Sequence, residues 1–397
     1  MKVRILFVVN SLRFGGAEKH VVTLLNQLDP ARFHIGLAYL KAEHDLLPQL
    51  DQSHLAGGVF CVQVSKKIDI AAMKMLAAYI AEQQVDIVVC TNNYPLWYGW
   101  FGRLLAGKPR SVNGKARRAQ LVEVLHSTEL GALKYHLQMW LSRPFYLACQ
   151  RLVYVCENQR VFWRKRWLSL RRDDVIHNGI DIKHFTDRYS DAEKLAQRQQ
   201  YGAAAGDFVL GICAALRVEK AHGDLLQALA RLRAQGCQHL KVWLIGDGPM
   251  RPALEAQIAV LDLQDAVQIT GFIADVRPLV ASCDAMTLVS HSETFSLAAL
   301  EAMALGKPML MTEVGGANEQ IRPGENGYLY PVGDIEALAG HILQLMAPGH
   351  AAQLGCEARN TVLQNFSIAV MVEKYQNLFE TLAHDPSAPP APSGPRT

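Results

Sequence analysis

Short apolar runs alternate with amphipathic segments along most of the chain. Runs of strand length, such as Val3–Val9 and Leu240–Ile245, are apolar at nearly every position, as in parallel strands buried on both faces of a sheet. Segments between them, such as Ala17–Leu28, repeat apolar residues at helical spacing. This alternation runs through two rounds separated by a pause. We therefore expect an α/β fold with two doubly wound, Rossmann-like domains facing a cleft.

The pause spans residues 171–187 and contains Asn178-Gly179, a turn signal, so we expect an interdomain linker there. The domains are placed at residues 1–175 and 176–365. Residues 385–397 are rich in Pro, Ser and Ala, which predicts a disordered tail. The expected strands are Val3–Val9, His34–Leu40, Val85–Cys90, Gln120–Leu125, Leu152–Cys156, Phe208–Ala214, Leu240–Ile245, Val267–Thr270, Ala285–Val289 and Pro308–Thr312. The main expected helices are Ala17–Leu28, Gly223–Ala234, Arg251–Leu261, Ser296–Leu305, Ile335–Leu345 and Ile368–Leu382.

The composition is that of a folded protein with two unlike halves. Half of the 397 residues are hydrophobic and 19% are charged, which excludes a disordered chain. Residues 1–175 hold 24 Lys and Arg against 13 Asp and Glu, a balance of +11, whereas residues 176–397 hold 16 against 24, a balance of −8. The N-terminal half is expected to meet an anionic partner. No apolar run reaches the roughly 18 residues of a membrane-spanning helix.

Two basic clusters carry much of the positive charge. In residues 160–172, basic residues are interleaved with aromatic ones, and Trp163 and Trp167 share one helical face. Such a surface suits an anionic membrane; the alternative is a solvated helix whose aromatic side chains pack inward. Nucleic acid is disfavoured, because the sequence contains no recognised nucleic-acid-binding module. The other cluster consists of Lys108, Arg110, Lys115, Arg117 and Arg118.

Several common chemistries are missing from the sequence. The eight cysteines form no C-x-x-C pair and have no metal-ligand spacing to a histidine, which favours a reducing compartment and no metal site. There is no G-x-S-x-G elbow, H-E-x-x-H, Walker loop or EF-hand. A D-x-D motif for metal-bound diphosphate is also missing. We therefore expect neither a metal nor a cofactor.

Two segments suit phosphate binding. Gly15-Gly16 follows the first strand and opens a helix, whose N-terminal amides attract anions. The alternative there is a structural tight turn, and the G-x-G-x-x-G fingerprint is absent. Arg217 and Lys220 follow the strand Phe208–Ala214, where two cations suit a diphosphate. The alternative for this pair is surface ion pairing with Glu219 and Asp224.

Two carboxylates and a histidine complete the candidates. Glu293 ends a strand, and Glu301 lies eight residues later on a rather apolar helix that starts near Ser296. The helix N-terminus can hold a phosphate while the carboxylates bind hydroxyls on either side. The alternative gives Glu293 a capping role and Glu301 a solvated face. His126 ends the strand Gln120–Leu125 and is expected to point into the cleft, although a structural histidine is the commoner case.

The order of these motifs resembles that of family-4 retaining glycosyltransferases with the GT-B fold, over almost the whole chain. The matching segments are GGAE, VIHNGID, ALRVEK, LIGDGPMRPALE, VQITGF, SETFSLAALEAMALGKP, Val314-Gly315-Gly316 and ENGYLYP. The resemblance implies an acceptor-binding N-terminal domain, a nucleotide-sugar-binding C-terminal domain and a C-terminal helix, residues 366–384, that crosses back to the N-terminal domain. The chain departs from the family where Ser296 replaces a common Gly and His177 a common Pro.

The resemblance also implies roles for individual residues. Arg217 and Lys220 would bind the donor diphosphate, Glu301 would hold the ribose hydroxyls, Glu293 would contact the transferred sugar, and His126 would lie near that sugar.

Further donor contacts follow from the same resemblance. Backbone at Ser296 and Leu297 would meet the diphosphate, Phe295 would belong to the same set, and backbone near Phe272 would meet the base. Gly15-Gly16 would border the donor phosphate or the acceptor.

The resemblance thus implies a metal-independent, retaining transfer from a nucleoside-diphosphate sugar, UDP-sugar preferred over GDP-sugar, to an acceptor hydroxyl. The basic N-terminal half favours a lipid-linked glycan or a lipopolysaccharide or exopolysaccharide precursor as the acceptor. The expected location is the cytoplasm, with peripheral binding to the inner face of the cell membrane. Two alternatives on the same fold are a nucleotide-sugar 2-epimerase and a non-catalytic binding partner, since fold alone does not decide function.

Overall fold

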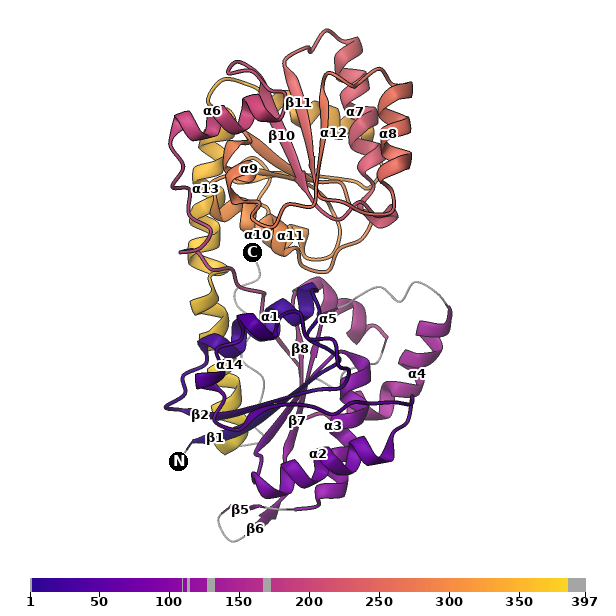
Figure 1. Cartoon of the computed structure of the whole chain (residues 1–397), viewed down its shortest axis with the longest axis vertical. Helices are drawn as coiled ribbons and strands as arrows, with labels where there is room; N and C mark the ends of the chain where they lie inside the picture. The colour runs from indigo at the N-terminus through magenta and orange to yellow at the C-terminus, as the bar shows by residue number, and fades with distance from the viewer. Residues whose placement is uncertain (1, 109, 113–114, 127–132, 167–172, 385–397) are drawn as a thin grey trace. The chain divides into compact units, whose positions relative to one another are not determined.

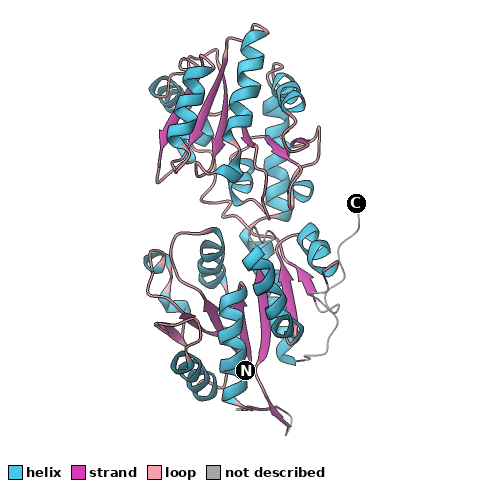
Figure 2. Ribbon diagram, turned by 90° about the vertical axis from the view of Figure 1, so that its right-hand side faces the viewer, coloured by secondary structure: helices cyan, strands magenta, loops and turns pink. Residues whose placement is uncertain are grey.

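The computed structural model describes residues 2–108, 110–112, 115–126, 133–166 and 173–384. The chain divides into two compact units: unit 1 is Met1–Asn178 with Ile368–Thr397, and unit 2 is Gly179–Ser367. Each unit is a parallel sheet with helices on both faces (Figures 1 and 2), which confirms the expected α/β fold with two Rossmann-like domains. The tail expected at residues 385–397 lies outside the described residues.

Unit 1 is built on a seven-stranded sheet of order β3-β2-β1-β4-β7-β8-β9, in which every neighbouring pair is parallel. The strand order reverses between β1 and β4. The strands are β1 Val3–Val9, β2 Phe33–Tyr39, β3 Gly58–Cys61, β4 Ile87–Thr91, β7 Gln120–Leu125, β8 Arg151–Tyr154 and β9 Asp173–Val175, with a separate antiparallel pair β5 Arg110–Val112 and β6 Lys115–Arg117. The helices are α1 Gly16–Gln27, α2 Ile70–Glu82, α3 Asn93–Ala106, α4 Leu133–Leu147, α5 Glu157–Arg164 and α14 Ile368–His384, with short 3₁₀ turns at Leu47–Gln49 and Gln52–His54.

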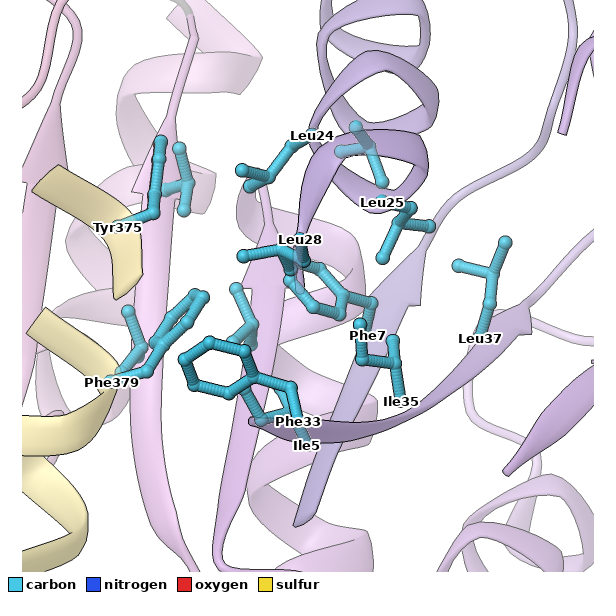
Figure 3. Close-up of a cluster of buried hydrophobic side chains, with 14 of the residues drawn as sticks. Ile5, Phe7, Leu24, Leu25, Leu28, Phe33, Ile35, Leu37, Tyr375 and Phe379 are labelled. Carbon is cyan, nitrogen blue, oxygen red and sulfur yellow. The ribbon is translucent and has the colours of Figure 1, made fainter. Parts of the chain in front are cut away.

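The two faces of this sheet bury two separate apolar clusters. Because side chains alternate along a strand, Phe7 enters one cluster with α1 and α14, while Leu6 and Val8 enter the other with α2 and α3. Figure 3 shows the first cluster, in which the ring of Phe379 lies edge-on to Phe7 and Phe33, with centroids 6.0 and 6.2 Å apart. The continuous apolar character of the strands follows from this double burial.

The C-terminal helix α14 completes unit 1, although it follows unit 2 in the sequence. Its buried residues, among them Met371, Tyr375 and Phe379, pack against α1, β1 and β4. The expected return of this helix to the N-terminal domain is therefore confirmed. Where the chain re-enters unit 1, the outgoing and returning segments pair, since the amide of Ile180 donates to the carbonyl of Phe366 at 2.9 Å.

Unit 2 is built on a six-stranded parallel sheet of order β12-β11-β10-β13-β14-β15, whose strand order reverses between β10 and β13. The strands are β10 Phe208–Cys213, β11 Leu240–Ile245, β12 Val267–Gly271, β13 Ala285–Leu288, β14 Met309–Thr312 and β15 Gly327–Tyr330. The helices are α6 Asp191–Gln200, α7 His222–Ala234, α8 Arg251–Val260, α9 Arg277–Ser282, α10 Leu297–Ala304, α11 Ala317–Gln320, α12 Ile335–Leu345 and α13 His350–Asn365, with a 3₁₀ turn η3 at Val218–Lys220.

One expected linker segment is instead part of the sheet. Strand β9 begins at Asp173, inside the pause of the apolar pattern, and pairs with β8. Asp173 is buried and accepts from the Arg164 guanidinium at 3.0 Å, while Asp174 lies 3.4 Å from the buried Arg151. A strand whose buried side chains are ion-paired carries no apolar signal, so periodicity could not reveal it.

The interpretation of Trp163 as a membrane-facing residue is wrong. Its side chain is 2% exposed and belongs to the second apolar cluster, beside Tyr146 and Tyr154. The inward-packing alternative therefore holds for Trp163, while Trp167 lies outside the described residues, as do the side chains of residues 109–117 in the other basic cluster. Within the described ranges, no helix is both long and apolar enough to cross a membrane.

Glu123, at the centre of β7, is an exception to the apolar pattern. It is fully buried beside Cys90 and Cys149, and burial raises the pKa of its carboxyl well above the usual value. The folded protein therefore holds this carboxyl in its neutral form at pH values where the unfolded chain ionises it.

We predict that Glu123→Gln stabilises the protein increasingly as the pH rises above about 4.5. Above the unfolded pKa the unfolded chain loses a proton that the folded wild type keeps, so wild-type stability falls by up to about 1.4 kcal/mol per pH unit until the folded pKa is reached. Urea denaturation at pH 5, 6.5 and 8 measures this effect, and a difference in free energy of unfolding that does not change with pH would contradict it.

Candidate functional site

The predicted site residues of unit 2 converge where its strand order reverses. Arg217 and Lys220 lie in the segment that follows β10, and Glu293, Ser296 and Leu297 lie in the segment that follows β13. Because β10 and β13 are adjacent parallel strands, their carboxyl ends open on the same edge of the sheet. Open α/β sheets bind ligands at such a reversal point.

An ion pair joins the two segments. The ammonium of Lys220 contacts Oε1 of Glu293, and the same oxygen accepts from the Ser290 hydroxyl at 3.0 Å. The Lys220 and Glu293 side chains are only 22% and 15% exposed. Lys220 therefore does not pair with Asp224, which lies 3.2 Å from Nε2 of His291 instead. The amide of His291 donates to the carbonyl of Glu219 at 2.9 Å, so backbone and side chains together fix the two segments.

Arg217 is the exposed cation of this group. Its side chain is 63% exposed, and its guanidinium lies 3.9 Å from Glu219, the outer limit of an ion pair. A solvated pair at this distance is worth little, so an anionic ligand could engage the guanidinium at small cost.

The N-terminus of α10 lies beside these charges. Ser296 caps the helix, because its hydroxyl accepts from the amide of Ala299 at 3.3 Å, and Gln320 holds the Ser296 carbonyl at 2.9 Å. The capping role considered for Glu293 is therefore filled by Ser296. The remaining first-turn amides, at Leu297 and Ala298, give this end of the helix its anion-attracting character.

Gly315 fixes the backbone around Glu293. Its φ is +55°, and an added Cβ would lie 2.2 Å from the carbonyl oxygen of Glu293 and 2.6 Å from that of Thr294. The amide of Gly316 then donates to the Thr294 carbonyl at 2.7 Å. Only glycine permits this approach, so the segment after β14 sets the position of Glu293.

A second close approach supports Arg217. A Cβ at Gly246 would lie 2.2 Å from the carbonyl oxygen of Ala214, and one at Gly248 would lie 2.5 Å from that of Leu216. The loop after β11 thus packs directly on the backbone leading to Arg217. Sequence reasoning assigned these glycines no role, although their spacing around Asp247 directly after a strand was a usable signal.

The other predicted donor residues fall in different surroundings. Glu301 lies on α10 and is half-buried. The ring of Phe295 is buried against Phe366, with centroids 5.5 Å apart, which leaves only its backbone for a ligand. Phe272 follows β12, two strands away from β10, and is 82% exposed.

Sequence reasoning also missed His222, which begins α7. It is buried, and burial together with the nearby charge of Lys220 lowers its pKa to about 4. A neutral imidazole therefore lies beside the Lys220 ammonium. The sequence showed only a histidine next to a lysine, with no signal of burial.

In unit 1, the two predicted groups follow different strands: Gly15-Gly16 follows β1, which borders the reversal point, and His126 follows β7, the strand beyond β4. Gly15 is the N-cap of α1 and has no side-chain cap, and a Cβ at Gly16 would meet nothing within 4 Å. Beside Gly15 lies the Glu18 carboxylate, whose Oε2 would be 2.3 Å from an added Cβ, so an anion at this helix end must displace that side chain. The glycines are not required by crowded backbone there.

His126 follows β7, and its amide donates to the Asn92 side chain at 3.1 Å. Asn92 itself adopts φ +67° at the end of β4, so its side chain turns back to this bond. Burial, and secondarily the neighbouring His20, hold the pKa of His126 well below its usual value. The imidazole is therefore neutral at physiological pH and suits polarising a substrate hydroxyl better than donating a proton.

No group of three or more metal-ligating side chains occurs among the residues the structure describes. What unit 2 offers is a set of cations, helix-terminal amides and one carboxylate at a single sheet edge. This set can bind a phosphorylated ligand and contact a hydroxyl beside its phosphates.

Comparison with known proteins identifies the two units by family. Residues 14–184 match the model of Glycosyltransferase Family 4, and residues 207–348 match that of Glycosyl transferases group 1. N-acetyl-alpha-D-glucosaminyl L-malate synthase of Bacillus anthracis is 31% identical over 212 residues, 53% of this chain and 54% of the relative. The lipopolysaccharide core biosynthesis glycosyltransferase LpsE of Rhizobium meliloti is 30% identical over 160 residues, 40% of this chain and 46% of the relative. The matched segments span about half the length of these curated relatives.

Solved structures share the fold over nearly the whole chain. Anabaena HepE in complex with UDP is 24% identical with a TM-score of 0.81, and covers 96% of this chain and 100% of that one. A glycosyltransferase from Rickettsia africae is 19% identical with a TM-score of 0.80, and covers 97% and 99%. These similarities establish the GT-B fold.

We predict that Lys220→Met lowers the free energy of unfolding by about 1–3 kcal/mol, because it leaves a half-buried carboxylate at Glu293 without its cation. Adding Glu293→Gln should restore part of this loss, so the two substitutions are non-additive in a double-mutant cycle measured by urea denaturation. The exposed pair Arg322–Glu325, 3.3 Å apart, provides the matched control, where coupling should stay below about 1 kcal/mol. Additive effects at Lys220 and Glu293 would contradict the pairing.

Proposed function

The chain belongs to the family-4 glycosyltransferases, with a domain of that family at residues 14–184 and a group 1 domain at residues 207–348. We therefore propose that it is a sugar-transferring enzyme. Its donor is a nucleoside-diphosphate sugar and its acceptor a hydroxyl group. The transfer retains the configuration of the anomeric carbon and needs no metal ion.

The observation that supports this proposal best is the convergence of Lys220, Glu293 and the α10 N-terminus at the strand reversal of unit 2. Arg217 extends this group with an exposed guanidinium. A diphosphate fits such a set, because it places two adjacent anionic groups against two cations and free helix-terminal amides. Glu301, one to two helical turns from the N-terminus of α10, is assigned to the ribose hydroxyls.

The chemical step breaks the bond between the anomeric carbon and the diphosphate oxygen. Negative charge that develops on the leaving diphosphate is stabilised by Arg217, Lys220 and the amides of Leu297 and Ala298. The acceptor oxygen bonds to the anomeric carbon on the same face, and its proton passes to the departing phosphate oxygen. Glu293 holds hydroxyls of the transferred sugar and is not assigned as a covalent nucleophile.

His126 is assigned to the transferred sugar as well. Its imidazole is neutral because burial lowers its pKa, so it can accept a hydrogen bond from a sugar hydroxyl or donate one to it without adding charge. A neutral imidazole orients the sugar while the leaving phosphate handles the proton.

We assign a uridine nucleotide as the preferred donor, with guanosine as the second choice. Support comes from Anabaena HepE, whose solved complexes contain UDP and UDP-glucose. For the acceptor we propose a lipid-linked glycan or a precursor of lipopolysaccharide or exopolysaccharide. The name of LpsE places that protein in lipopolysaccharide core biosynthesis. The net positive charge of the N-terminal half of this chain suits an anionic acceptor.

A different surface from the one expected supports membrane binding. On α4, Trp140 is 62% exposed and Leu141 52%, and exposed Leu147 lies two turns from Trp140 on the same face. Arg143 lies among them and donates to the carbonyl of Arg166. Aromatic and apolar side chains with an arginine among them suit the headgroup region of an anionic leaflet. We therefore propose peripheral membrane association through α4.

We predict that one nucleoside diphosphate among UDP, GDP and ADP raises the melting temperature of the protein without added metal. Saturation at 100 times Kd adds about 2.7 kcal/mol to the folded state. Arg217→Ala should weaken this nucleotide about tenfold or more, because it removes a charged hydrogen-bond donor from the diphosphate. Differential scanning fluorimetry over a concentration series measures both effects.

Arg322→Ala is the matched control for Arg217→Ala, since Arg322 is similarly exposed at 60% and lies on another loop of unit 2. An equal loss in the two variants would show a non-specific charge effect. No shift for any nucleotide at millimolar concentration would contradict the donor site. Conversion of the donor to another nucleotide sugar without an acceptor would favour an epimerase.

We predict that the protein sediments with vesicles of phosphatidylglycerol at low salt but not with phosphatidylcholine vesicles. The double variant Trp140→Ser/Leu141→Ser should bind several-fold more weakly, because two exposed apolar side chains leave the interface. Val260→Ser, at an 84% exposed position of unit 2, is the control and should bind like the wild type. If the double variant binds like the wild type, α4 is not the membrane-binding surface. If the wild type does not bind these vesicles, the proposed membrane association is wrong.

A further inference from the structure

Three elements of unit 1 bring polar side chains together behind His126. His20 lies on α1, Tyr375 on α14, and Asn178 closes the first segment of unit 1. All three are almost fully buried, with exposures of 4%, 0% and 5%. Polar groups at such depth in an apolar cluster are costly unless they bind one another.

These side chains form one connected group. Nε2 of His20 lies 3.3 Å from the Tyr375 hydroxyl, and the Asn178 side chain lies near enough to affect the pKa of His20. The ring of His20 lies edge-on to that of His126, with centroids 4.7 Å apart and planes at 63°. His20 therefore contacts both Tyr375 and His126.

The strand geometry explains why His126 meets this group. Side chains alternate along β7, and Val122 and Val124 belong to the apolar cluster shared with α1 and α14. His126 continues the same face just beyond the end of the strand, while the Asn92 side chain holds its amide at 3.1 Å. Its backbone and one face of its ring are thus fixed. Its Nε2 is buried and has no hydrogen-bond partner among the described residues.

His20 is itself neutral. Burial lowers its pKa to about 4, a shift that the neighbouring Asn178 only partly opposes. A neutral, buried ring held by the Tyr375 hydroxyl cannot rotate freely, so its edge presents a fixed surface to His126.

We propose that His20 is a positioning residue for His126: held by Tyr375, it fixes the plane of the His126 ring and with it the direction in which this imidazole meets a substrate hydroxyl. The inference rests on the proposed function, in which His126 contacts the transferred sugar. In this proposal the interface between α1 and α14 supports the reaction as well as the stability of unit 1.

The test uses Tyr375→Phe and His20→Phe, which keep an aromatic ring and remove the hydrogen bonds. Tyr79→Phe is the matched control, because the Tyr79 hydroxyl donates to the Gly57 carbonyl at 2.7 Å in the same unit, away from His126. Each His20 and Tyr375 variant should lower kcat by about tenfold while the KM for the donor stays within about twofold, the pattern of a lost transition-state interaction. Tyr79→Phe should leave both constants unchanged.

A double-mutant cycle with His126→Ala separates positioning from a general structural effect. If His20 acts through His126, His20→Phe causes no further loss of kcat in the His126→Ala background. Losses that multiply would overturn the proposal.

A measurement without substrate keeps the proposal separate from the proposed function. In the free protein at pH 7.5, ¹⁵N NMR of the His126 imidazole reports its tautomer, which should change in His20→Phe and Tyr375→Phe and remain unchanged in Tyr79→Phe. Unchanged His126 signals in both test variants would overturn the proposal, whatever the activity. A changed tautomer in a protein that transfers no sugar would overturn the proposed function alone. If His20→Phe does not fold, Tyr375→Phe carries the same comparison with the loss of a single hydroxyl.

Discussion

Parallel strands buried on both faces leave almost no room for charge inside either unit, and the location of the chemistry follows from that. Each strand pairs its backbone with its neighbours and packs apolar side chains above and below. Apart from buried exceptions such as Glu123 and the ion-paired Asp173, charged side chains gather where the strands end. In unit 2, Lys220 and Glu293 meet in this way although 73 residues separate them in sequence. In unit 1, His126 emerges at the corresponding end of β7.

The same constraint explains what the sequence could predict. An apolar run shows where a strand ends, and the first polar residues after it are candidates for a site, so Arg217, Lys220, Glu293 and His126 could be selected without coordinates. Contacts that depend on distant backbone could not be selected. Gly315 presses on the carbonyl of Glu293 from the segment after the next strand, and nothing in its immediate neighbourhood indicates that partner.

His20 was hidden for a different reason. Its neighbours Val21, Val22, Leu24 and Leu25 are buried residues of an amphipathic helix, so a histidine among them looks like part of the packing. Its partner Tyr375 lies 355 residues away. Aromatic residues on helices show a related ambiguity: Trp163 and Trp140 both sit in amphipathic segments, yet Trp163 is buried and Trp140 exposed. Spacing defines a face of a helix, but only the fold decides whether that face meets the sheet or the solvent.

The placement of α14 has a consequence for how the chain matures during synthesis. Unit 1 begins with β1, yet Phe7 and Phe33 find their partner Phe379 only after all of unit 2 has been made. Unit 2 is continuous in sequence and can close its core as soon as it leaves the ribosome. Of the two units, the one whose first strand is translated earlier is therefore the last to be completed, and until α14 docks, the apolar residues that it covers stay exposed. Exposed apolar residues of this kind are recognised by chaperones and favour aggregation. Because α14 follows unit 2 in the sequence, the two units complete their folding in the opposite order to that in which their first strands are translated.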